Sequence, residues 1–337
     1  MLVAVCVLLL VPLAACSRFA PVAEEQSASE PETSPPPADT RATGVWQAPH
    51  GLVQTPIWPG DTPNIGNAAA TPESVLTAYT PEALEGNTSQ AVFDVSVPTM
   101  TVFPPQGRNA HAAVVVFPGG GFRAVVLTVE GTEICRWITA HGLTCVLAKY
   151  RVPNSNHHWD DDCNCAVTPR HLTALQDAQR TIRLVRSQAQ QLDIDPDKIG
   201  VMGFSAGGYL VAQTSNIFQP AYDAVDEIDR ISSRPDFAIA FFPGHLCRTG
   251  DTLDPGIRVT RQTPPTFLLQ AWDDPVNDVC NSVVYARALD AAGVPSEVHL
   301  FASGGHAFGL RRNQSPDTAW PPLVENWLRE RGVLGEP

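Results

Sequence analysis

Apolar residues recur along this chain with spacings that change from one segment to the next, and each spacing predicts a type of element. Residues 91–103 alternate apolar and polar positions, as a half-exposed strand does. Residues 112–117 are continuously apolar, as in a strand buried on both faces. Between Leu172 and Leu192 the apolar side chains recur at steps of three and four, which indicates an amphipathic helix.

The same reasoning predicts the remaining elements. Further strands are expected at residues 143–148, 198–202, 237–242, 266–271 and 297–301, and further helices at residues 131–140, 206–215, 282–292 and 323–331. Strands that alternate with helices in this way indicate an α/β fold, in which a mostly parallel, twisted sheet carries helices on both faces.

The first residues have the composition of an export signal. Residues 2–13 are continuously apolar but too short to span a bilayer, and Leu13-Ala14-Ala15-Cys16 follows as a small-residue cleavage site that ends in cysteine. This pattern resembles a bacterial lipoprotein signal, although no Lys or Arg precedes the apolar run. Residues 1–16 are therefore expected to be a signal peptide, with Cys16 as the lipidated residue. The alternative is an ordinary signal peptide cut nearby, and both place the protein outside the cytoplasm.

Two further segments precede the catalytic domain. Residues 17–43 are rich in Pro, Ser, Glu and Thr and are expected to form a disordered linker, because such a segment buries too little apolar surface to offset its ordering entropy. Residues 44–90 add Trp46, Ile57 and Trp58, which are costly to leave in water, so we expect an ordered arm packed on the domain. The catalytic domain is expected at residues 91–337.

The charge of the chain bears on its partners. The formal net charge is -13, and the basic residues are scattered rather than clustered. A nucleic-acid surface needs clustered Lys and Arg, so we expect no nucleic-acid partner, and membrane contact only through the N-terminal lipid. These observations leave the oligomeric state open.

A candidate nucleophile lies between a predicted strand and a predicted helix. The stretch Gly203-Phe-Ser-Ala-Gly207 has the pattern of a nucleophile elbow, in which Ser205 projects from a tight turn. Side chains at Gly203 and Gly207 would collide with the neighbouring strand and helix. The alternative, a glycine-rich loop with a surface serine, is weakened by the strand before it and the helix after it.

An activated serine needs a base, and the base needs an orienting carboxylate. Both follow in the order that this fold requires, serine, then acid, then histidine. Asp274 comes after the strand at residues 266–271, with Asp273 as the rival acid, and His306 comes after the next strand. Each could separately be an ordinary loop residue. The three together favour a catalytic triad.

Glycines after an earlier strand complete the predicted site. The attacked carbonyl becomes an oxyanion that needs preorganised donors. We expect these to be the backbone N–H groups of Ala206 and of Gly120 or Gly121, which belong to the segment Pro118-Gly-Gly-Gly121. A glycine turn without a ligand is the alternative. The spacing does not match a dinucleotide fingerprint.

With these motifs the sequence resembles bacterial α/β-hydrolase serine esterases of the acetylxylan-esterase-like group, which are related to dienelactone hydrolases. The resemblance rests on Ile57-Trp-Pro-Gly60, Val116-Phe-Pro-Gly-Gly-Gly-Phe122, Ala148-Lys-Tyr-Arg-Val-Pro153, Leu175-Gln-Asp-Ala-Gln-Arg180, Gly203-Phe-Ser-Ala-Gly-Gly208, Ser233-Arg-Pro-Asp-Phe237, Asp273-Asp-Pro275 and Gly304-Gly-His-Ala-Phe-Gly309. It implies hydrolysis of ester-linked acyl groups, commonly acetyl on plant polysaccharides, with no metal or organic cofactor. Pro118 stands where the lipase-like branch has His, and Ser205 where dienelactone hydrolases use Cys.

The cysteines suggest disulfides in an exported chain. Cys247 and Cys280 follow two strands that should end at the same edge of the sheet, so this pair ranks first. Cys135 and Cys145 could equally be small buried side chains. Residues 154–168 hold His, Asp and two cysteines and look like an insertion near the site. A disulfide-pinned loop is favoured there over a metal site.

Smaller expectations concern single residues. Asp177 and Arg180 are expected to form a structural ion pair on their helix. Trp272, Phe122 and Phe204 border the site, either as core residues or as the lining of an acyl pocket.

The expected reaction is two-step acyl transfer from a carboxylic ester, most simply deacetylation of a xylan-like carbohydrate. The alternatives are a general carboxylesterase or lipase, a peptidase of the prolyl-oligopeptidase type, and a non-catalytic binding protein on the same fold. A peptidase of that type usually carries a large propeller domain, for which we expect no room, and a binding protein typically lacks a triad residue.

Overall fold

The computed structural model describes residues 39–63, 72–79, 88–152, 158–160, 165–167, 172–311 and 319–335. All of them belong to one of the two compact units of the chain, residues 37–337. The predicted signal peptide, Cys16 and most of the predicted linker lie outside the described residues. Within the described residues, no helix is long and apolar enough to cross a membrane.

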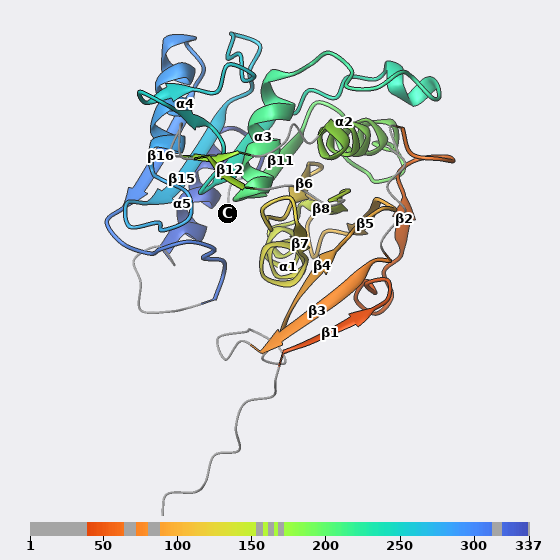
Figure 1. Cartoon of the computed structure of the whole chain (residues 1–337). Helices are drawn as coiled ribbons and strands as arrows, with labels where there is room; N and C mark the ends of the chain where they lie inside the picture. Colours follow the sequence, from red (N-terminus) through yellow and green to blue (C-terminus); the bar gives the residue numbers. More distant parts are fainter. Residues whose placement is uncertain are drawn as a thin grey trace, which may run out of the picture. The chain divides into compact units, whose positions relative to one another are not determined.

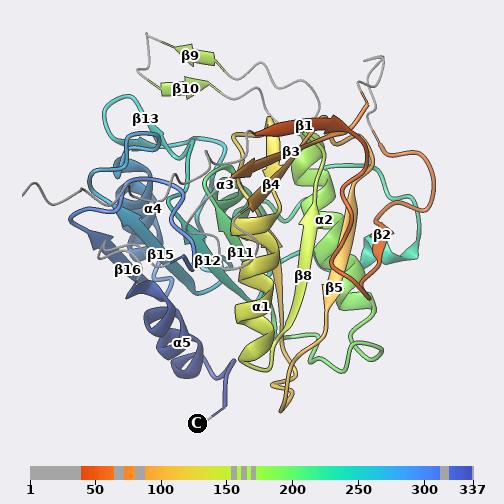
Figure 2. The ribbon, with the colours of Figure 1, turned by 90° about the horizontal axis from the view of Figure 1, so that it is seen from below.

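The main sheet has eight strands in the order β16-β15-β12-β11-β6-β8-β5-β2. These are β2 (Gln54–Pro56), β5 (Thr99–Phe103), β6 (Ala113–Phe117), β8 (Thr144–Lys149), β11 (Ile199–Phe204), β12 (Phe237–Phe241), β15 (Thr266–Ala271) and β16 (Ser296–Phe301). The strands from β16 to β8 pair in parallel, whereas β5 and β2 pair antiparallel at one edge, where Figure 2 shows β8, β5 and β2 in turn. The predicted mostly parallel sheet is confirmed.

Five α-helices pack on this sheet: α1 (Glu133–Ala140), α2 (Leu172–Ser187), α3 (Ala206–Asn216), α4 (Cys280–Ala291) and α5 (Trp320–Glu330). Figure 1 shows α1 and α2 on opposite sides of β6 and β8. The rings of Trp137 in α1 and Trp320 in α5 lie 5.2 Å apart, so these two helices are neighbours. Every residue of β6, β8, β11, β12 and β15 is buried, as expected for strands covered on both faces.

A second, antiparallel sheet has the order β1-β3-β4-β7. Its strands are β1 (Thr40–Thr43), β3 (Ser74–Tyr79), β4 (Thr88–Phe93) and β7 (Ala124–Val126). The expected single strand at residues 91–103 is wrong: β4 and β5 belong to different sheets, because the chain turns at Asp94, whose φ is 57°. The end of the predicted linker is also a strand, since β1 gains backbone hydrogen bonds from β3, which composition does not reveal.

The remaining short elements lie in loops. They are the π-helix η1 (Thr128–Thr132), the 3-10 helix η2 (Glu227–Arg230) and two hairpins, β9 (His158–Asp160) with β10 (Cys165–Val167) and β13 (Cys247–Arg248) with β14 (Thr252–Leu253). The hairpin β9–β10 lies in the predicted insertion. Cys163 lies outside the described residues, so a disulfide there remains a prediction.

The residues before β4 pack on the domain through three apolar side chains. Trp46, Ile57 and Trp58 are all buried. The Trp58 indole donates to Asp177 at 2.8 Å, and the Arg180 guanidinium donates to the Ile57 carbonyl at 2.9 Å. Helix α2 therefore contacts this segment through two charged side chains as well as through apolar surface.

The expected ion pair between Asp177 and Arg180 is wrong. Asp177 pairs with Arg151 at 2.7 Å, and Arg180 pairs with Asp226 and Asp229 at 2.6 and 2.8 Å. Both α2 residues are buried, and a buried charge is stable only when several partners satisfy it. Such partners come from distant parts of the chain, which spacing along one helix does not show.

Two disulfides are present among the described residues. Cys247 and Cys280 are joined, as predicted, with their Cα atoms 5.7 Å apart. Cys135 of α1 and Cys145 of β8 are joined as well, with Cα atoms 5.3 Å apart. The alternative of two free buried thiols at Cys135 and Cys145 is therefore wrong, because the helix packs directly on the strand that carries its partner.

Candidate active site

The predicted site residues all follow the carboxyl ends of parallel strands. Pro118 begins a loop after β6, Ser205 follows β11, Asp274 lies after β15 and His306 lies after β16. These strands belong to one sheet and run in one direction, so their carboxyl ends share one edge. Ligand sites of open α/β sheets lie at this edge.

Ser205 occupies a strained turn between β11 and α3. Its backbone has φ 53° and ψ -116°, a conformation that costs a non-glycine residue free energy and that is characteristic of a nucleophile elbow. A Cβ on Gly203 would collide with the Gly207 backbone in α3, and a Cβ on Gly207 would collide with the Phe117 carbonyl in β6. The two glycines therefore permit the tight turn, as the sequence suggested.

His306 lies between Ser205 and Asp274. Its Nε2 is 3.0 Å from the Ser205 Oγ, and its Nδ1 is 2.8 Å from the Asp274 Oδ2. The Asp274 side chain has no exposed surface, and that of His306 is 13% exposed. The Phe242 ring packs edge-on against the imidazole, with centroids 4.8 Å apart. The three side chains thus have the spacing of a nucleophile, a base and an orienting acid.

The two neighbouring aspartates have separate contacts. The second oxygen of Asp274 accepts the N–H groups of Val276 and Asn277 at 2.8 and 2.9 Å, which fixes the carboxylate toward His306. Asp273 instead accepts the Gly305 N–H at 2.8 Å and so holds the backbone before His306. The structure therefore places Asp274, and not Asp273, on the imidazole.

Asn277 is a polar contact of the nucleophile that the sequence did not single out. Its Nδ2 donates to the Phe242 carbonyl at 2.9 Å and lies 3.4 Å from the Ser205 Oγ. A Cβ on Gly244 would lie 2.9 Å from the Asn277 amide oxygen, so glycine leaves room for that amide. An Asn three residues after the acid has no distinctive pattern, because loops contain many such residues.

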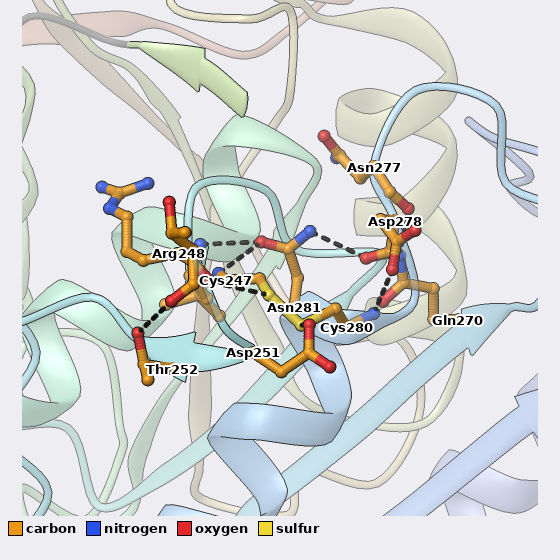
Figure 3. The surroundings of a disulfide bond; sticks show 11 residues. Cys247, Arg248, Asp251, Thr252, Gln270, Asn277, Asp278, Cys280 and Asn281 are labelled. Carbon is orange, nitrogen blue, oxygen red and sulfur yellow. Dashed lines mark hydrogen bonds between the residues drawn. A yellow bond between two sulfur atoms is a disulfide. The ribbon is translucent and has the colours of Figure 1, made fainter. Parts of the chain in front are cut away.

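We call residues 272–279 the acid loop, and Figure 3 shows how its far end is held. Gln270 donates to the carbonyls of Asn277 and Asp278 at 2.6 and 3.3 Å. Asn281 accepts the Cys247 N–H at 2.9 Å and donates to the Asp278 carbonyl at 2.7 Å. The Cys247–Cys280 disulfide lies beside these bonds and ties the end of the acid loop to β13.

We call residues 118–123 the oxyanion loop. Gly120 and Gly121 have positive φ values of 129° and 61°. Within the described residues, the N–H groups of Gly120, Gly121 and Ala206 donate to no acceptor. Ala206 is the first residue of α3, whose N-terminal end favours negative charge. All three predicted donors are thus unpaired within the described residues, and Gly119, which precedes Gly120, lies against Ser205.

Glu130 of η1 is a second residue that sequence reasoning missed. Its carboxylate accepts the Gly119 N–H of the oxyanion loop at 2.6 Å. Burial raises the pKa of Glu130 to about 7, against the lowering effects of the Gly119 hydrogen bond and the charge of His306. Glu130 lies in a mixed stretch, between Thr128 and Glu133, which gave no sequence signal for this contact.

The aromatic residues near the site divide into two groups. Phe122 and Phe204 are buried core residues, whereas Trp272 is 59% exposed at the start of the acid loop. Phe122 contacts the rings of Tyr209 and His245, with centroids 6.4 and 6.0 Å apart. Of the three, Trp272 has surface available for a substrate.

A metal site finds little support in the described part of the chain. The one group of potential ligands whose atoms approach each other consists of Cys247, Asp251 and Cys280. Both sulfur atoms are joined in the disulfide, so neither is a thiolate ligand.

Comparison with solved structures finds hydrolases that share this fold. A bifunctional acetyl ester-xyloside hydrolase from Caldicellulosiruptor lactoaceticus superposes with a TM-score of 0.63 and 28% identity, over 84% of this chain and 97% of that one. A butyrate-bound esterase from Thermogutta terrifontis has a TM-score of 0.58 and 22% identity, over 72% and 92%. The chain has the α/β-hydrolase fold. The resemblance to α/β-hydrolase esterases inferred from the sequence is therefore confirmed.

Several sequence relatives of this chain are named as ester hydrolases. The BD-FAE family model matches residues 100–219. An acetylxylan esterase from Xylanibacter ruminicola is 28% identical over 236 residues, which are 63% of this chain and 44% of that protein. An ethyl acetate hydrolase from Pseudomonas putida is 26% identical over 244 residues, 63% and 71% of the two chains. The chain thus spans less than half of the acetylxylan esterase.

Proposed function

We propose that this protein is a serine esterase, that Ser205, His306 and Asp274 are its catalytic triad, and that acetylated, xylan-like carbohydrate is its substrate. The contacts of His306 carry the proposal, at 3.0 Å to Ser205 and 2.8 Å to Asp274. We would not expect an ordinary loop histidine to contact both a serine in a strained turn and a fully buried carboxylate.

The proposed reaction has two steps. His306 Nε2 takes the Ser205 proton while Oγ attacks the ester carbonyl, and the resulting oxyanion accepts hydrogen bonds from Ala206 and from Gly120 or Gly121. The protonated His306 then gives its proton to the leaving alcohol. In the second step, His306 takes a proton from water, which attacks the acyl carbonyl. The bond to the Ser205 Oγ then breaks, His306 returns the proton to that oxygen, and the acid is released. Asp274 holds the imidazole tautomer and stabilises its positive charge.

The substrate class rests on the relatives. The acetylxylan esterase is named for acetylated xylan, and the bifunctional hydrolase is named for acetyl esters and xylosides, which supports a carbohydrate alcohol. The ethyl acetate hydrolase favours a second candidate, a general carboxylesterase for small acyl esters. Both candidates use the same triad and differ in the alcohol.

The first experiment separates these candidates on purified protein. Acetate release from acetylated xylan is compared with hydrolysis of p-nitrophenyl acetate, butyrate and octanoate. We expect acetyl esters to be preferred and acetylated xylan to be deacetylated. Equal rates on all chain lengths, without acetate release from xylan, would favour the general carboxylesterase. The Ser205→Ala variant should fold normally and lose hydrolysis of every ester, and retained activity would refute the triad.

We also propose that the protein is exported and anchored by a lipid on Cys16. The apolar run and Leu13-Ala14-Ala15-Cys16 support this, as do the two disulfides, since disulfides persist in oxidising compartments. Expression with labelled palmitate in a bacterial host tests it. Label should appear in the membrane fraction of the wild type and not of Cys16→Ser; equal labelling of both would exclude lipidation at Cys16.

A further inference from the structure

Two hydrogen bonds hold the oxyanion loop, one at each end of the peptide bond between Pro118 and Gly119. The Pro118 carbonyl oxygen accepts a hydrogen bond of 2.5 Å from the Tyr150 hydroxyl, and the Gly119 N–H donates to the Glu130 Oε2 at 2.6 Å. Tyr150 and Glu130 are both buried, so water does not compete for these bonds. The plane of this peptide is therefore fixed. Gly120 and Gly121 come next in the chain, so the orientation of their N–H groups depends on this plane.

Glu130 also lies beside the nucleophile. A Cβ on Gly119 would be 2.7 Å from the Glu130 Oε2 and 2.9 Å from the Ser205 Cβ, so the carboxylate and the serine flank the same glycine. Only glycine allows this approach. Because the Ser205 Oγ is 3.0 Å from the His306 Nε2, the Glu130 carboxylate lies on the side of the site that holds the imidazole. The charge of His306 lowers the pKa of Glu130, which burial otherwise raises.

Tyr150 and Glu133 are the other buried titratable groups on the described elements that pack around Glu130. Tyr150 stays neutral, because burial and the Glu130 carboxylate both raise its pKa above the usual range. Glu133 on α1 is paired with Arg311 at 3.0 Å. The described residues of the strands β4, β6 and β7, which also pack on η1, carry no titratable side chain. His306 is thus the neighbour whose charge changes during the proposed reaction.

We propose that Glu130 is a positioning residue for the reaction at Ser205. It holds the Gly119 N–H so that Gly120 and Gly121 present their N–H groups to the oxyanion, and its negative charge stabilises the protonated His306. In the low dielectric of the site, a carboxylate stabilises an imidazolium far more than in water. Glu130 takes part in no covalent step, since the Ser205 proton moves to His306. This inference rests on the proposed ester hydrolysis.

Two variants separate the hydrogen bond from the charge. Glu130→Ala removes both, and we expect kcat on p-nitrophenyl acetate to fall by about 100-fold, as for loss of an oxyanion donor, with KM changed by less than about threefold. Glu130→Gln keeps an acceptor for Gly119 and loses only the charge, so we expect a smaller loss of about tenfold.

The pH profile of kcat/KM is the readout that a merely structural role would not change. In the wild type, protonation of Glu130 lowers the activity in addition to protonation of His306, so the acidic limb of the logarithmic profile should be steeper than a slope of one near pH 7. In Glu130→Gln the slope should be one. Glu133→Gln, an equally buried carboxylate near the same helix start, is the matched control and should keep the wild-type slope. An unchanged slope in Glu130→Gln would overturn the role of the charge.

A second measurement separates this proposal from the proposed function. A fluorophosphonate probe labels an activated serine without ester turnover. A wild type that neither hydrolyses esters nor reacts with the probe refutes the esterase. A wild type that does both, with Glu130→Ala and Glu130→Gln equal to it in kcat, labelling rate and pH profile, refutes the positioning role alone. If Glu130→Ala does not fold, the near-isosteric Glu130→Gln decides.

Discussion

The oxyanion loop and the acid loop both end beside Ser205, yet they are held by different means. Buried side chains, Tyr150 and Glu130, fix the oxyanion loop through one peptide bond. The acid loop is more exposed, with Trp272 and Val276 about 60% accessible, and its backbone turns around the Asp274 carboxylate. A disulfide closes its far end.

This difference suggests that the two sides of the site respond to different perturbations. A buried carboxylate with a pKa of about 7 makes the oxyanion loop sensitive to pH near neutrality. The acid loop exposes Trp272 and Val276 to water, so a covalent link at its end adds to the order that the buried Gln270 and Asn281 provide. The acid loop should therefore be sensitive to reduction and the oxyanion loop to proton concentration.

The largest expected effect distinguishes the two aspartates of the acid loop. Asp274→Ala leaves the His306 Nδ1 without its buried partner, and kcat/KM for p-nitrophenyl acetate should fall by about 10³- to 10⁴-fold. Asp273→Ala removes only the acceptor for the Gly305 N–H, and the loss should stay below about tenfold. Equal losses in the adjacent pair would mean that the loop as a whole, rather than the Asp274 carboxylate, orients the base.

The second effect compares the two disulfides. Replacing Cys247 and Cys280, which are 33 residues apart, by alanine should lower the free energy of unfolding by about 3–4 kcal/mol, through entropy returned to the unfolded chain. Replacing Cys135 and Cys145, 10 residues apart, should cost about 3 kcal/mol on the same basis. Urea denaturation measures both losses.

Activity separates the two disulfides further. Only the Cys247–Cys280 bond ends at the acid loop, so its removal should also lower kcat several-fold, whereas the Cys135–Cys145 variant should keep the wild-type kcat at temperatures where it is folded. Mild reductant on the wild type should reproduce the first effect, because Cys247 and Cys280 are partly exposed and Cys135 and Cys145 are buried. Equal kcat values in all variants would show that the disulfide does not order the acid loop.

The inner parallel strands were predictable from the sequence because each is buried on both faces. Continuous apolar runs such as residues 113–117 and 237–241 carry that signal without reference to the rest of the chain. The second sheet gave no such signal. Its strands β1 and β3 are partly or wholly exposed and exist through backbone pairing between distant residues, which no local pattern encodes.

The residues of the candidate site also fall into those that the sequence predicted and those that it did not. Ser205, Asp274 and His306 each follow a predicted strand, so the nucleophile motif and the chain order were enough to propose them, with Asp273 left as the rival acid. Asn277 and Glu130 act on the site through contacts whose partners are far away in the sequence, Phe242 and Gly119 among them. Their residue types are common in loops and helix starts, and only the folded chain shows that they reach Ser205 or its oxyanion loop.

The smallest expected effect is on the free energy of unfolding and concerns Glu130, which holds the oxyanion loop. Burial raises the pKa of Glu130 from 4.5 to about 7, so the folded chain keeps this proton to higher pH than the unfolded chain. The stability that the proton provides is complete below pH 4.5 and is lost as the pH rises through 7. Glu130→Gln has no such proton, so its free energy of unfolding relative to the wild type should increase by about 3 kcal/mol between pH 4 and 8.

Urea denaturation of both proteins at several pH values measures this trend, with Glu133→Gln as the control. Glu133 is as buried as Glu130 but is paired with Arg311, so its substitution should give no gain in relative stability over the same range. A constant difference between Glu130→Gln and the wild type would mean that Glu130 ionises in the folded chain as it does in water. The oxyanion loop would then be held by geometry alone, and its contrast with the acid loop would no longer include a response to pH.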